Sequence, residues 1–226
     1  MSGNAPKPAL EINGLRYSWP RQHVLLSIET LTIAQGSKVL VQGPSGSGKT
    51  TFLSLVTGVL TPSAGSVCVL GHDLKMLTPS QRDALRRDTM GVIFQMFNLL
   101  PFLTVLENVL LPLQLSQKRR QSLTQGSTPT QEAHRLLDAL GLSSAVMARS
   151  THQLSIGQQQ RVAAARALIG NPSLIIADEP TSALDEGNQN EFLTLLIEQV
   201  HQTNATLIMV SHDSRIAERF DQVMTL

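Results

Sequence analysis

A glycine-rich segment between two apolar segments limits the possible folds of this chain more than any other feature. The segment is Gly43–Thr50, with the sequence GPSGSGKT; an apolar segment typical of a strand, Lys38–Gln42, precedes it, and Lys49–Leu60 has helical spacing. Glycines allow backbone N–H groups to turn towards phosphate oxygens, and the positive end of a helix dipole adds to their attraction for anions. The segment therefore predicts a phosphate-binding loop in which Lys49 reaches the terminal phosphates and the Thr50 hydroxyl binds Mg²⁺.

The rest of the chain alternates short apolar segments with amphipathic ones. We expect strands at Val24–Ile33, Lys38–Gln42, Ser66–Leu70, Gly91–Gln95, Ser173–Ala177, Thr206–Val210 and Val223–Leu226. We expect helices at Lys49–Leu60, Pro79–Arg87, Thr104–Leu111, Gln131–Leu140, Ser155–Ile169, Asn188–His201 and Ile216–Phe220. This alternation is typical of an α/β fold with a mostly parallel sheet. The stretch from about Met90 to Leu154 has few strands, so we place an inserted helical subdomain at about residues 90–165.

Length and composition exclude several classes of protein. With 226 residues, 42% of them apolar, the chain suits one globular domain with an insertion, which we place at residues 10–226. Met1–Ala9 is polar, contains two prolines and is unlike a secretory signal, so we expect a loose tail there. A net charge of +1 and 4% aromatic residues argue against a nucleic-acid-binding surface. The single cysteine, Cys68, lies in an expected strand and suits packing better than chemistry.

A second candidate site follows the apolar segment Leu174–Ala177, which ends in Asp178 and Glu179. Open α/β sheets bind ligands at the carboxyl ends of their strands. Asp178 suits Mg²⁺, a hard cation that prefers oxygen ligands, and Glu179 is placed to polarise an attacking water. Charged residues also follow many buried strands without any function, and it is the phosphate-binding loop that favours the functional interpretation here.

Other polar and aromatic residues permit two interpretations each. Ser155 and Gln158 fit a helix capping box, but a helix N-terminus with Gly157 in its first turn is also an anion site. His212 follows an expected strand and Gln95 ends one, and each suits either solvent or a hydrogen bond to phosphate or water. Tyr17 and Trp19 suit either core packing or stacking on a purine.

In this order, the segments resemble the nucleotide-binding subunit of ABC transporters over about residues 10–226. The resembling motifs are Walker A at Gly43–Thr50, the Q-loop glutamine Gln95, the signature at Leu154–Gln158, Walker B at Leu174–Glu179, the D-loop at Ser182–Asp185 and the switch histidine His212. The segment Gln95–Val109 is similar to the branch that includes lipoprotein-releasing and macrolide-exporting systems. The resemblance implies a P-loop NTPase core with a mostly parallel sheet, an antiparallel β edge subdomain and the inserted α-helical subdomain.

The resemblance implies an ATPase that hydrolyses ATP to ADP and phosphate and forms a head-to-tail dimer of two copies, with ATP and Mg²⁺ at the interface. The residues that it assigns to ATP are Trp19, Gly43, Pro44, Ser45, Gly46, Ser47, Gly48, Lys49, Thr50, Thr51, Ser155, Gly157, Gln158 and Asp185. It assigns catalysis to Glu179, His212, Lys49 and Gln95, and Mg²⁺ to Thr50, Gln95 and Asp178. Trp19, which precedes Pro20, is favoured over Tyr17 for stacking on adenine.

The resemblance also implies a membrane permease as partner, at the cytoplasmic face of the inner membrane, and allows a periplasmic adaptor; it implies no nucleic acid. Phe97, Leu99 and Leu100 then suit either a docking surface for the permease or the core of the helical subdomain. We expect Gln114–Thr130 to be an exposed loop that allows a helical turn at Ser116–Leu123, and its Lys118–Arg120 suits solvent or anionic lipid. Substrate and direction of transport depend mainly on the permease and are not readable here.

Ile156 stands where the family most often has glycine, while Ser155 and Gly157 match the signature. An ABC-type ATPase that regulates a membrane partner without transport, like the cell-division-linked relatives, is the main alternative function. ABC ATPases of repair or translation usually have paired cassettes or long coiled coils, which are not found here, and a P-loop small-molecule kinase has no ABC signature. We expect no regulatory domain after Leu226, where the last expected strand ends.

Overall fold

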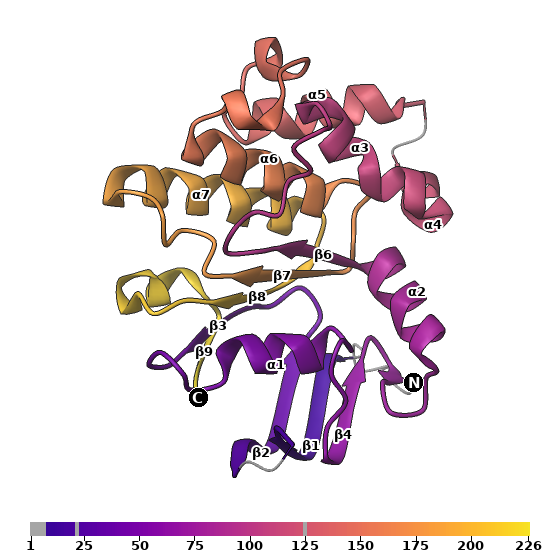
Figure 1. Ribbon diagram of the computed structural model, residues 1–226, viewed down its shortest axis with the longest axis vertical. Helices are drawn as coiled ribbons and strands as arrows, with labels where there is room; N and C mark the ends of the chain where they lie inside the picture. Colours follow the sequence, from indigo (N-terminus) through magenta and orange to yellow (C-terminus); the bar gives the residue numbers. More distant parts are fainter. Residues whose placement is uncertain (1–7, 21–22, 124–125) are drawn as a thin grey trace, which may run out of the picture. The chain divides into compact units, whose positions relative to one another are not determined.

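The computed structural model describes residues 8–20, 23–123 and 126–226, and it divides the chain into two compact units (Figure 1). The first unit comprises the chain up to Arg86 together with Thr206–Leu226, and the second is Arg87–Ala205. Within the described residues, no helix combines the length and the apolar character that crossing a membrane requires. Each unit combines strands with helices, as predicted for an α/β protein.

The first unit contains an antiparallel sheet with the strand order β2-β1-β4-β5. Its strands are β1 (Pro8–Ser18), β2 (Val24–Ala34), β4 (Ala64–Val69) and β5 (His72–Asp73). Ile12 in β1 lies opposite Leu31 on one side and Val67 on the other. Ile12 and Val67 are fully or almost fully buried and Leu31 is buried, so one face of this sheet is apolar. This sheet is the antiparallel edge subdomain that the resemblance implies.

The first unit also holds three parallel strands, with β3 (Lys38–Gln42) between β8 (Thr206–Val210) and β9 (Gln222–Thr225). Val39, Leu40 and Val41 have no exposed surface, as expected for a strand covered on both faces. The chain leaves β3 into the phosphate-binding loop and helix α1 (Lys49–Val56), which is shorter than the predicted Lys49–Leu60. Helix α2 (Pro79–Thr89) runs across the division between the units, and a 3₁₀ helix, η3 (Ser214–Arg219), precedes β9.

The second unit pairs β6 (Met90–Ile93) in parallel with β7 (Leu174–Asp178). Its helices are α3 (Val105–Leu115), α4 (Gln117–Gln121), α5 (Pro129–Ala139), α6 (Ile156–Leu168) and α7 (Glu186–Gln202), and short 3₁₀ turns lie at Ser144–Val146 and Thr151–Gln153. Helix α6 packs against β6, α3, α5 and α7 and so forms the centre of this unit. Gly91 allows the close approach of α6 to β6, since a Cβ atom there would lie 2.1 Å from the carbonyl oxygen of Ala167. Helices α3, α4 and α5 fall inside the stretch predicted as a helical subdomain.

The predicted tail is too long by two residues. Pro8 and Ala9 belong to β1, and Ala9 is fully buried, while residues 1–7 lie outside the described part of the chain. Pro8 pairs with Ala34, and the backbone N–H of Leu70 donates to the carbonyl of Ala9. Proline is tolerated at the first position of a strand, where no ladder hydrogen bond needs its missing N–H.

The prediction of an exposed loop at Gln114–Thr130 is wrong at its two ends, which belong to α3 and α5, whereas α4 confirms the helical turn allowed at Ser116–Leu123. Arg119 is only 4% exposed, whereas Lys118 and Arg120 face solvent. The Arg119 guanidinium donates to the carbonyls of Ala167 (2.7 Å) and Ile169 (3.0 Å), at the C-terminal end of α6. Burial lowers the pKa of Arg119 to about 10, which leaves the side chain charged at neutral pH. Arg119 is therefore a buried cap for α6.

Candidate functional site

The glycine-rich loop has the backbone conformation that a phosphate-binding loop requires. Gly46 and Gly48 adopt positive φ angles of 82° and 96°, which residues with a Cβ atom rarely adopt. Gly48 is the N-cap of α1, and no side chain caps this end of the helix. A Cβ at Gly48 would lie 2.8 Å from a methyl group of Leu26, and one at Gly43 would lie 2.5 Å from the Ser47 hydroxyl. The loop therefore turns its backbone inward and leaves the first N–H groups of α1 without a side-chain cap.

The polar groups of this loop suit an anion. The Lys49 ammonium donates to the carbonyls of Gly43 (2.8 Å) and Pro44 (2.9 Å), which do not neutralise its charge. The Ser47 hydroxyl oxygen is buried and has no hydrogen-bond partner within the described residues. Thr50 is exposed and Thr51 is half-buried. A buried hydroxyl, a folded lysine and an uncapped helix N-terminus together fit a phosphate group.

The two predicted carboxylates follow one another at the end of β7. Asp178 is the last residue of the strand, and Glu179 begins the turn that follows; both are half-buried. Glu179 has a φ of +45°, in the left-handed region that costs free energy for any residue other than glycine. The backbone N–H of Ser182 donates to the Glu179 carbonyl at 3.2 Å, so the turn closes on itself. Strained backbone of this kind persists only where the surrounding structure holds it.

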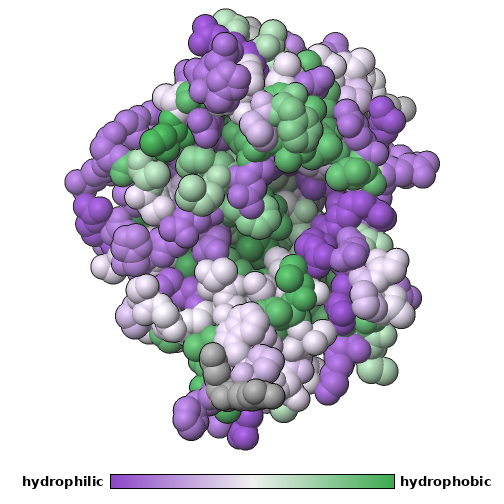
Figure 2. All heavy atoms as spheres, viewed as in Figure 1, coloured by the Kyte–Doolittle hydropathy of each residue, from purple (hydrophilic) through white to green (hydrophobic). Residues whose placement is uncertain are grey.

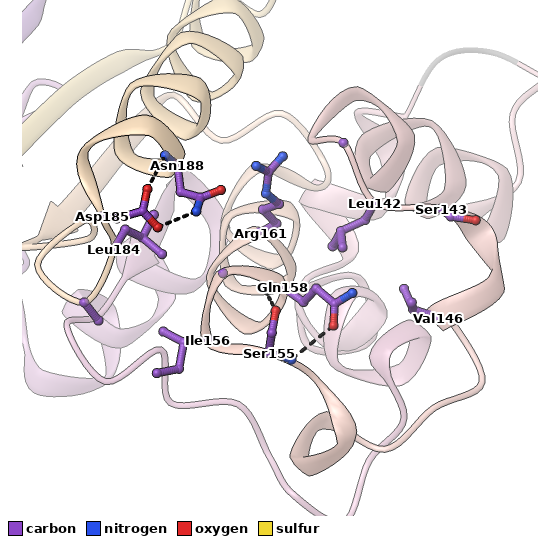
Figure 3. A pocket seen from close by; sticks show the side chains of 13 residues that line it. Leu142, Ser143, Val146, Ser155, Ile156, Gln158, Arg161, Leu184, Asp185 and Asn188 are labelled. Atoms are coloured by element: carbon purple, nitrogen blue, oxygen red, sulfur yellow. Dashed lines mark hydrogen bonds between the residues drawn. The ribbon is translucent and has the colours of Figure 1, made fainter.

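The signature and D-loop residues line one pocket of about 640 Å³ in the second unit (Figure 3). The N-terminus of α6 contributes Ser155, Gly157 and Gln158, and the N-terminus of α7 contributes Asp185. The predicted capping box is confirmed: the Gln158 backbone N–H donates to the Ser155 hydroxyl (3.3 Å), and the Ser155 N–H donates to the Gln158 side-chain oxygen (3.0 Å). The pocket therefore has two helix N-termini: the dipole of α6 attracts negative charge, and the Asp185 carboxylate already supplies such a charge to α7.

The charged side chains of this pocket are held in place. Asp185 accepts from the backbone N–H of Asn188 (3.0 Å), and this hydrogen bond holds the pKa of Asp185 below its ordinary value. Arg161, which also lines the pocket, donates to the Leu140 carbonyl (2.7 Å) and forms an ion pair with Glu191 (3.0 Å). Ile156 is more than half exposed at the rim. Figure 3 shows these side chains around the start of α6.

The remaining predicted residues lie in turns and at strand ends. Strand β6 ends at Ile93, two residues earlier than predicted, so Gln95 lies in the exposed turn after the strand. His212 is exposed, two residues after the end of β8. Trp19 is 40% exposed, whereas Tyr17 is only 7% exposed, and their rings meet edge to face with centroids 5.4 Å apart. Trp19 is therefore the ring of the two that is available to a ligand.

The predicted docking side chains are only partly available. Phe97 is buried and Leu99 and Leu100 are half-buried, whereas Met96 is 81% exposed and Phe102 is 78% exposed. Figure 2 shows apolar side chains gathered over the start of α3 and the segment before it. The sequence shows a mostly apolar segment, which does not indicate which of its side chains turn inward. Phe97 turns inward because its backbone has a φ of +59° and its carbonyl accepts from Arg166 of α6 at 2.6 Å.

The predicted residues divide between the two units. The loop residues from Gly43 to Thr51, with Trp19 and His212, belong to the first unit. Gln95, Asp178, Glu179 and the four pocket residues belong to the second. Within the described residues, no group of three or more His, Cys, Asp or Glu side chains could hold a metal.

Comparison with known proteins gives a consistent match. The family model described as ABC transporter matches residues 26–182. The lipoprotein-releasing system ATP-binding protein LolD of Legionella pneumophila is 38% identical over 206 residues, which cover 91% of this chain and 87% of that protein. The macrolide export ATP-binding/permease protein MacB of Rhodospirillum rubrum is 40% identical over 99% of this chain, which spans only 34% of that longer protein.

A solved structure is similar over almost the whole chain. It is the dimeric post-hydrolysis state of the ATP-binding cassette MJ0796 bound to ADP and Pi, with a TM-score of 0.83 and 33% sequence identity. The match covers 96% of this chain and 94% of that one. The likeness therefore extends to both units of the fold.

Proposed function

This chain belongs to the ABC transporter family of ATPases, and from that membership we propose that it is the ATP-hydrolysing motor subunit of an exporter or lipoprotein-release system. The relatives named above, LolD and MacB, are described as lipoprotein-releasing and macrolide export ATP-binding proteins. The observation that carries the proposal is the phosphate-binding loop, in which Lys49 folds over backbone carbonyls and the buried Ser47 hydroxyl has no partner within the described residues.

In this proposal the loop from Gly43 to Thr51 holds the phosphates of ATP, and Trp19 stacks on the adenine. Backbone N–H groups of the loop and the dipole of α1 favour the negative charge, and Lys49 adds a full positive charge. The exposure of Trp19 beside the buried Tyr17 supports this choice of ring. These interactions stabilise the charge that develops on the transferring phosphoryl group.

We assign hydrolysis to Glu179, with contributions from Gln95 and His212. Glu179 activates the attacking water as a general base, and His212 and Gln95 hydrogen-bond around the reacting groups. The oxygen donors of Thr50, Gln95 and Asp178 are of the type that Mg²⁺ prefers. These residues would hold Mg²⁺, which would offset the charge of the phosphates.

We further propose that the pocket at the start of α6 faces the ATP of a second copy, in a head-to-tail dimer. Ser155, Gly157, Gln158 and Asp185 would contribute to it. The N-terminus of α6 at the pocket supports this, because its dipole favours an anion. The solved structure of the MJ0796 cassette is described as dimeric, which supports a dimer of two copies. Hydrolysis would then break the link between the two copies.

The partner that receives this motion is proposed to be a membrane permease, which would hold the chain at the cytoplasmic face of the inner membrane. We propose Met96 and Phe102 as the docking side chains in place of the buried Phe97. Both are large, apolar and mostly exposed, and exposed apolar surface of this kind marks many interaction sites. A periplasmic adaptor would contact the permease and not this chain.

The substitution Glu179→Gln tests the proposal, because it keeps the size of the side chain and removes its basicity. We expect ATP hydrolysis to fall at least ~100-fold while ATP is still bound. We also expect an ATP-bound dimer to persist in size-exclusion chromatography with light scattering, because the nucleotide is no longer consumed.

The matched control is Glu198→Gln, which alters an exposed glutamate of α7 away from the pocket residues. This variant should hydrolyse ATP at the wild-type rate. The role of Glu179 would be wrong if both variants retained hydrolysis, and the ATPase function itself would be wrong if the wild-type chain neither bound nor hydrolysed ATP.

A further inference from the structure

Gln160 is a fully buried amide in the middle of the second unit. It lies in α6, five residues after Ser155, and its Nε2 donates to the carbonyl of Pro180, the residue that follows Glu179. Its Oε1 is buried and has no hydrogen-bond partner within the described residues. The residues that follow it in α6, from Val162 to Ala165, are apolar or small and fully buried. A polar side chain is therefore the exception at this position.

Stability alone does not explain this glutamine. Burying an amide with one of its groups unpaired costs free energy, and an apolar side chain of similar volume would avoid that cost. Unpaired polar groups in protein cores often mark functional strain or a catalytic role. The hydrogen bond to Pro180 is the contact that the amide makes and that an apolar side chain would not make.

The turn that Gln160 holds is strained. Glu179 has the left-handed φ of +45°, and the residues after it are tied to two helices. Gln160 of α6 holds Pro180, and Gln189 of α7 donates from its Nε2 to the Thr181 hydroxyl at 3.3 Å. Gln189 and Thr181 are both buried, so this second contact is also shielded from water. Gln160 thus holds the backbone next to Glu179, and Gln189 holds the Thr181 side chain of the same turn.

We propose that Gln160 is a positioning residue for hydrolysis, which sets the direction of the Glu179 carboxylate through the Pro180 carbonyl and links it to helix α6. The proposal rests on the function proposed above for Glu179. Since α6 is one continuous helix from Ile156 to Leu168, a movement of its N-terminus at Ser155 carries Gln160 with it. Contact of Ser155 with a nucleotide would then alter the placement of Glu179 within the same chain.

The substitution Gln160→Met tests the proposal, because methionine fills a similar volume without an N–H donor. We expect kcat for ATP hydrolysis to fall at least ~10-fold, since small misplacements of a catalytic group have effects of this size. The dissociation constant for ATP and the melting temperature should stay close to wild type. The rate is normalised to the number of ATP sites, so that unfolded protein does not count as lost activity.

Gln199→Met is the matched control. Gln199 is also a buried glutamine, in α7, but its amide oxygen accepts from Arg135 at 3.1 Å, away from the turn after Glu179. This variant should keep kcat within ~2-fold of wild type. Gln160→Asn is the second variant: it retains the amide but shortens the side chain by one methylene, so it should lose kcat in the same way.

The result that overturns the proposal is wild-type kcat in Gln160→Met and Gln160→Asn while Glu179→Gln is inactive; the proposed function would then stand without it. A loss of activity that disappears on normalisation to ATP sites, or that Gln199→Met shares, would also overturn it, because the role would be structural. If Glu179→Gln retained hydrolysis, the proposed function would fail first.

Discussion

Helices α1 and α6 present their N-termini differently, although we propose that both bind phosphate groups of ATP. Helix α1 begins after Gly48, which is in the left-handed conformation and supplies no side-chain cap. Helix α6 begins after Ser155, whose hydroxyl accepts from the Gln158 N–H while the Gln158 side chain accepts from the Ser155 N–H. One end leaves its backbone donors open to a ligand, and the other has already satisfied two of them.

This difference suggests two kinds of phosphate site. The first N–H groups of a helix need partners, and in α1 they lie behind a glycine loop that a phosphate would complete. In α6 the capping box stabilises the end without a ligand, so it can stand exposed in a single copy of the chain. What α6 still offers to an anion is the hydroxyl hydrogen of Ser155, the Gly157 N–H and the helix dipole.

At their C-terminal ends, the same two helices have similar polar contacts. An arginine donates to a carbonyl in each case: Arg86 to Thr57 (2.7 Å) after α1, and Arg119 to Ala167 (2.7 Å) within α6. The two arginines differ in burial, because Arg86 is partly exposed and forms an ion pair with Asp83, whereas Arg119 is buried. The comparison therefore predicts that the N-terminal ends of these helices matter most for binding the ligand, and the C-terminal ends for packing.

Replacing Lys49 should have the largest effect. In Lys49→Ala the loop loses the positive charge that we assign to the phosphates, so hydrolysis should fall about 10²- to 10³-fold and ATP should bind more weakly. Titration with ATP and a phosphate-release assay measure both. Lys75→Ala removes an exposed lysine of the same unit and should change neither. Equal activity in the two lysine variants would contradict the assignment of the loop.

The substitution Ser155→Asp separates capping from phosphate binding at α6. Aspartate caps helices as well as serine does, so the melting temperature should change by only about 1–2 °C. Its negative charge would face the phosphate of the second copy. ATP should therefore still bind to each single copy, while the ATP-dependent dimer of the Glu179→Gln background is lost in size-exclusion chromatography.

Thr128→Asp is the like-for-like control for this prediction. Thr128 caps α5 in a box with Gln131, the same arrangement of hydroxyl and glutamine as in Ser155 and Gln158. This variant should leave the dimer intact. A dimer that survives Ser155→Asp would mean that the start of α6 does not meet the phosphate of a second copy.

The comparison also shows which parts of the fold are readable from the sequence. The strands Lys38–Gln42 and Thr206–Val210 have the predicted bounds, because buried apolar runs between turn residues have one interpretation. Strand β1 (Pro8–Ser18) was not predicted. Its apolar alternation changes phase at Gly14, where φ is +59° and the pairing with β4 shifts register. A pattern search of period two therefore finds two short fragments and no strand.

The functional and buried polar residues likewise divide into those that the sequence predicts and those that it does not. The glycine loop and the capping box depend on local backbone geometry, so residue types at fixed spacing predict them. The inward turn of Arg119 within a basic run, and the burial of Gln160, depend on tertiary packing of α4 and α6. Spacing along one helix does not reveal which polar residue meets a free carbonyl on another element.

At the C-terminal ends, Arg119→Met should destabilise the second unit more than Arg86→Met destabilises the first. Removal of Arg119 leaves the buried carbonyls of Ala167, Ile169 and Met90 without this donor, which should cost about 2–4 kcal/mol. Arg86→Met should cost about 1 kcal/mol. Urea denaturation measures both. Arg120→Met alters the exposed neighbour in α4 and should change stability by less than about 0.5 kcal/mol. A similar loss of stability in all three variants would contradict the role of Arg119 as a buried cap.

The smallest expected effect is at Asp88, whose charge supports Arg119 at the end of α6. Hydrogen bonds from Arg87 (2.8 Å) and Ser116 (2.7 Å) hold the pKa of Asp88 below its ordinary value, although burial opposes them. A carboxyl whose pKa is lowered by folding stabilises the folded chain at pH values above its pKa in the unfolded chain, ~3.9. This contribution is lost as the pH falls through the pKa of the folded chain.

Asp88→Asn should therefore be less stable than wild type by about 1 kcal/mol at pH 7, and the gap should close below about pH 4. Urea denaturation at pH 7, 5, 4 and 3 measures the gap. Asp83→Asn is the control, since Asp83 is mostly exposed and its ion pair with Arg86 belongs to the α1 end; its gap should be smaller at pH 7. A gap at Asp88 that stays constant from pH 7 to 3 would mean that its charge does not support the α6 cap. The hydrogen bonds of Arg119 alone would then stabilise that cap.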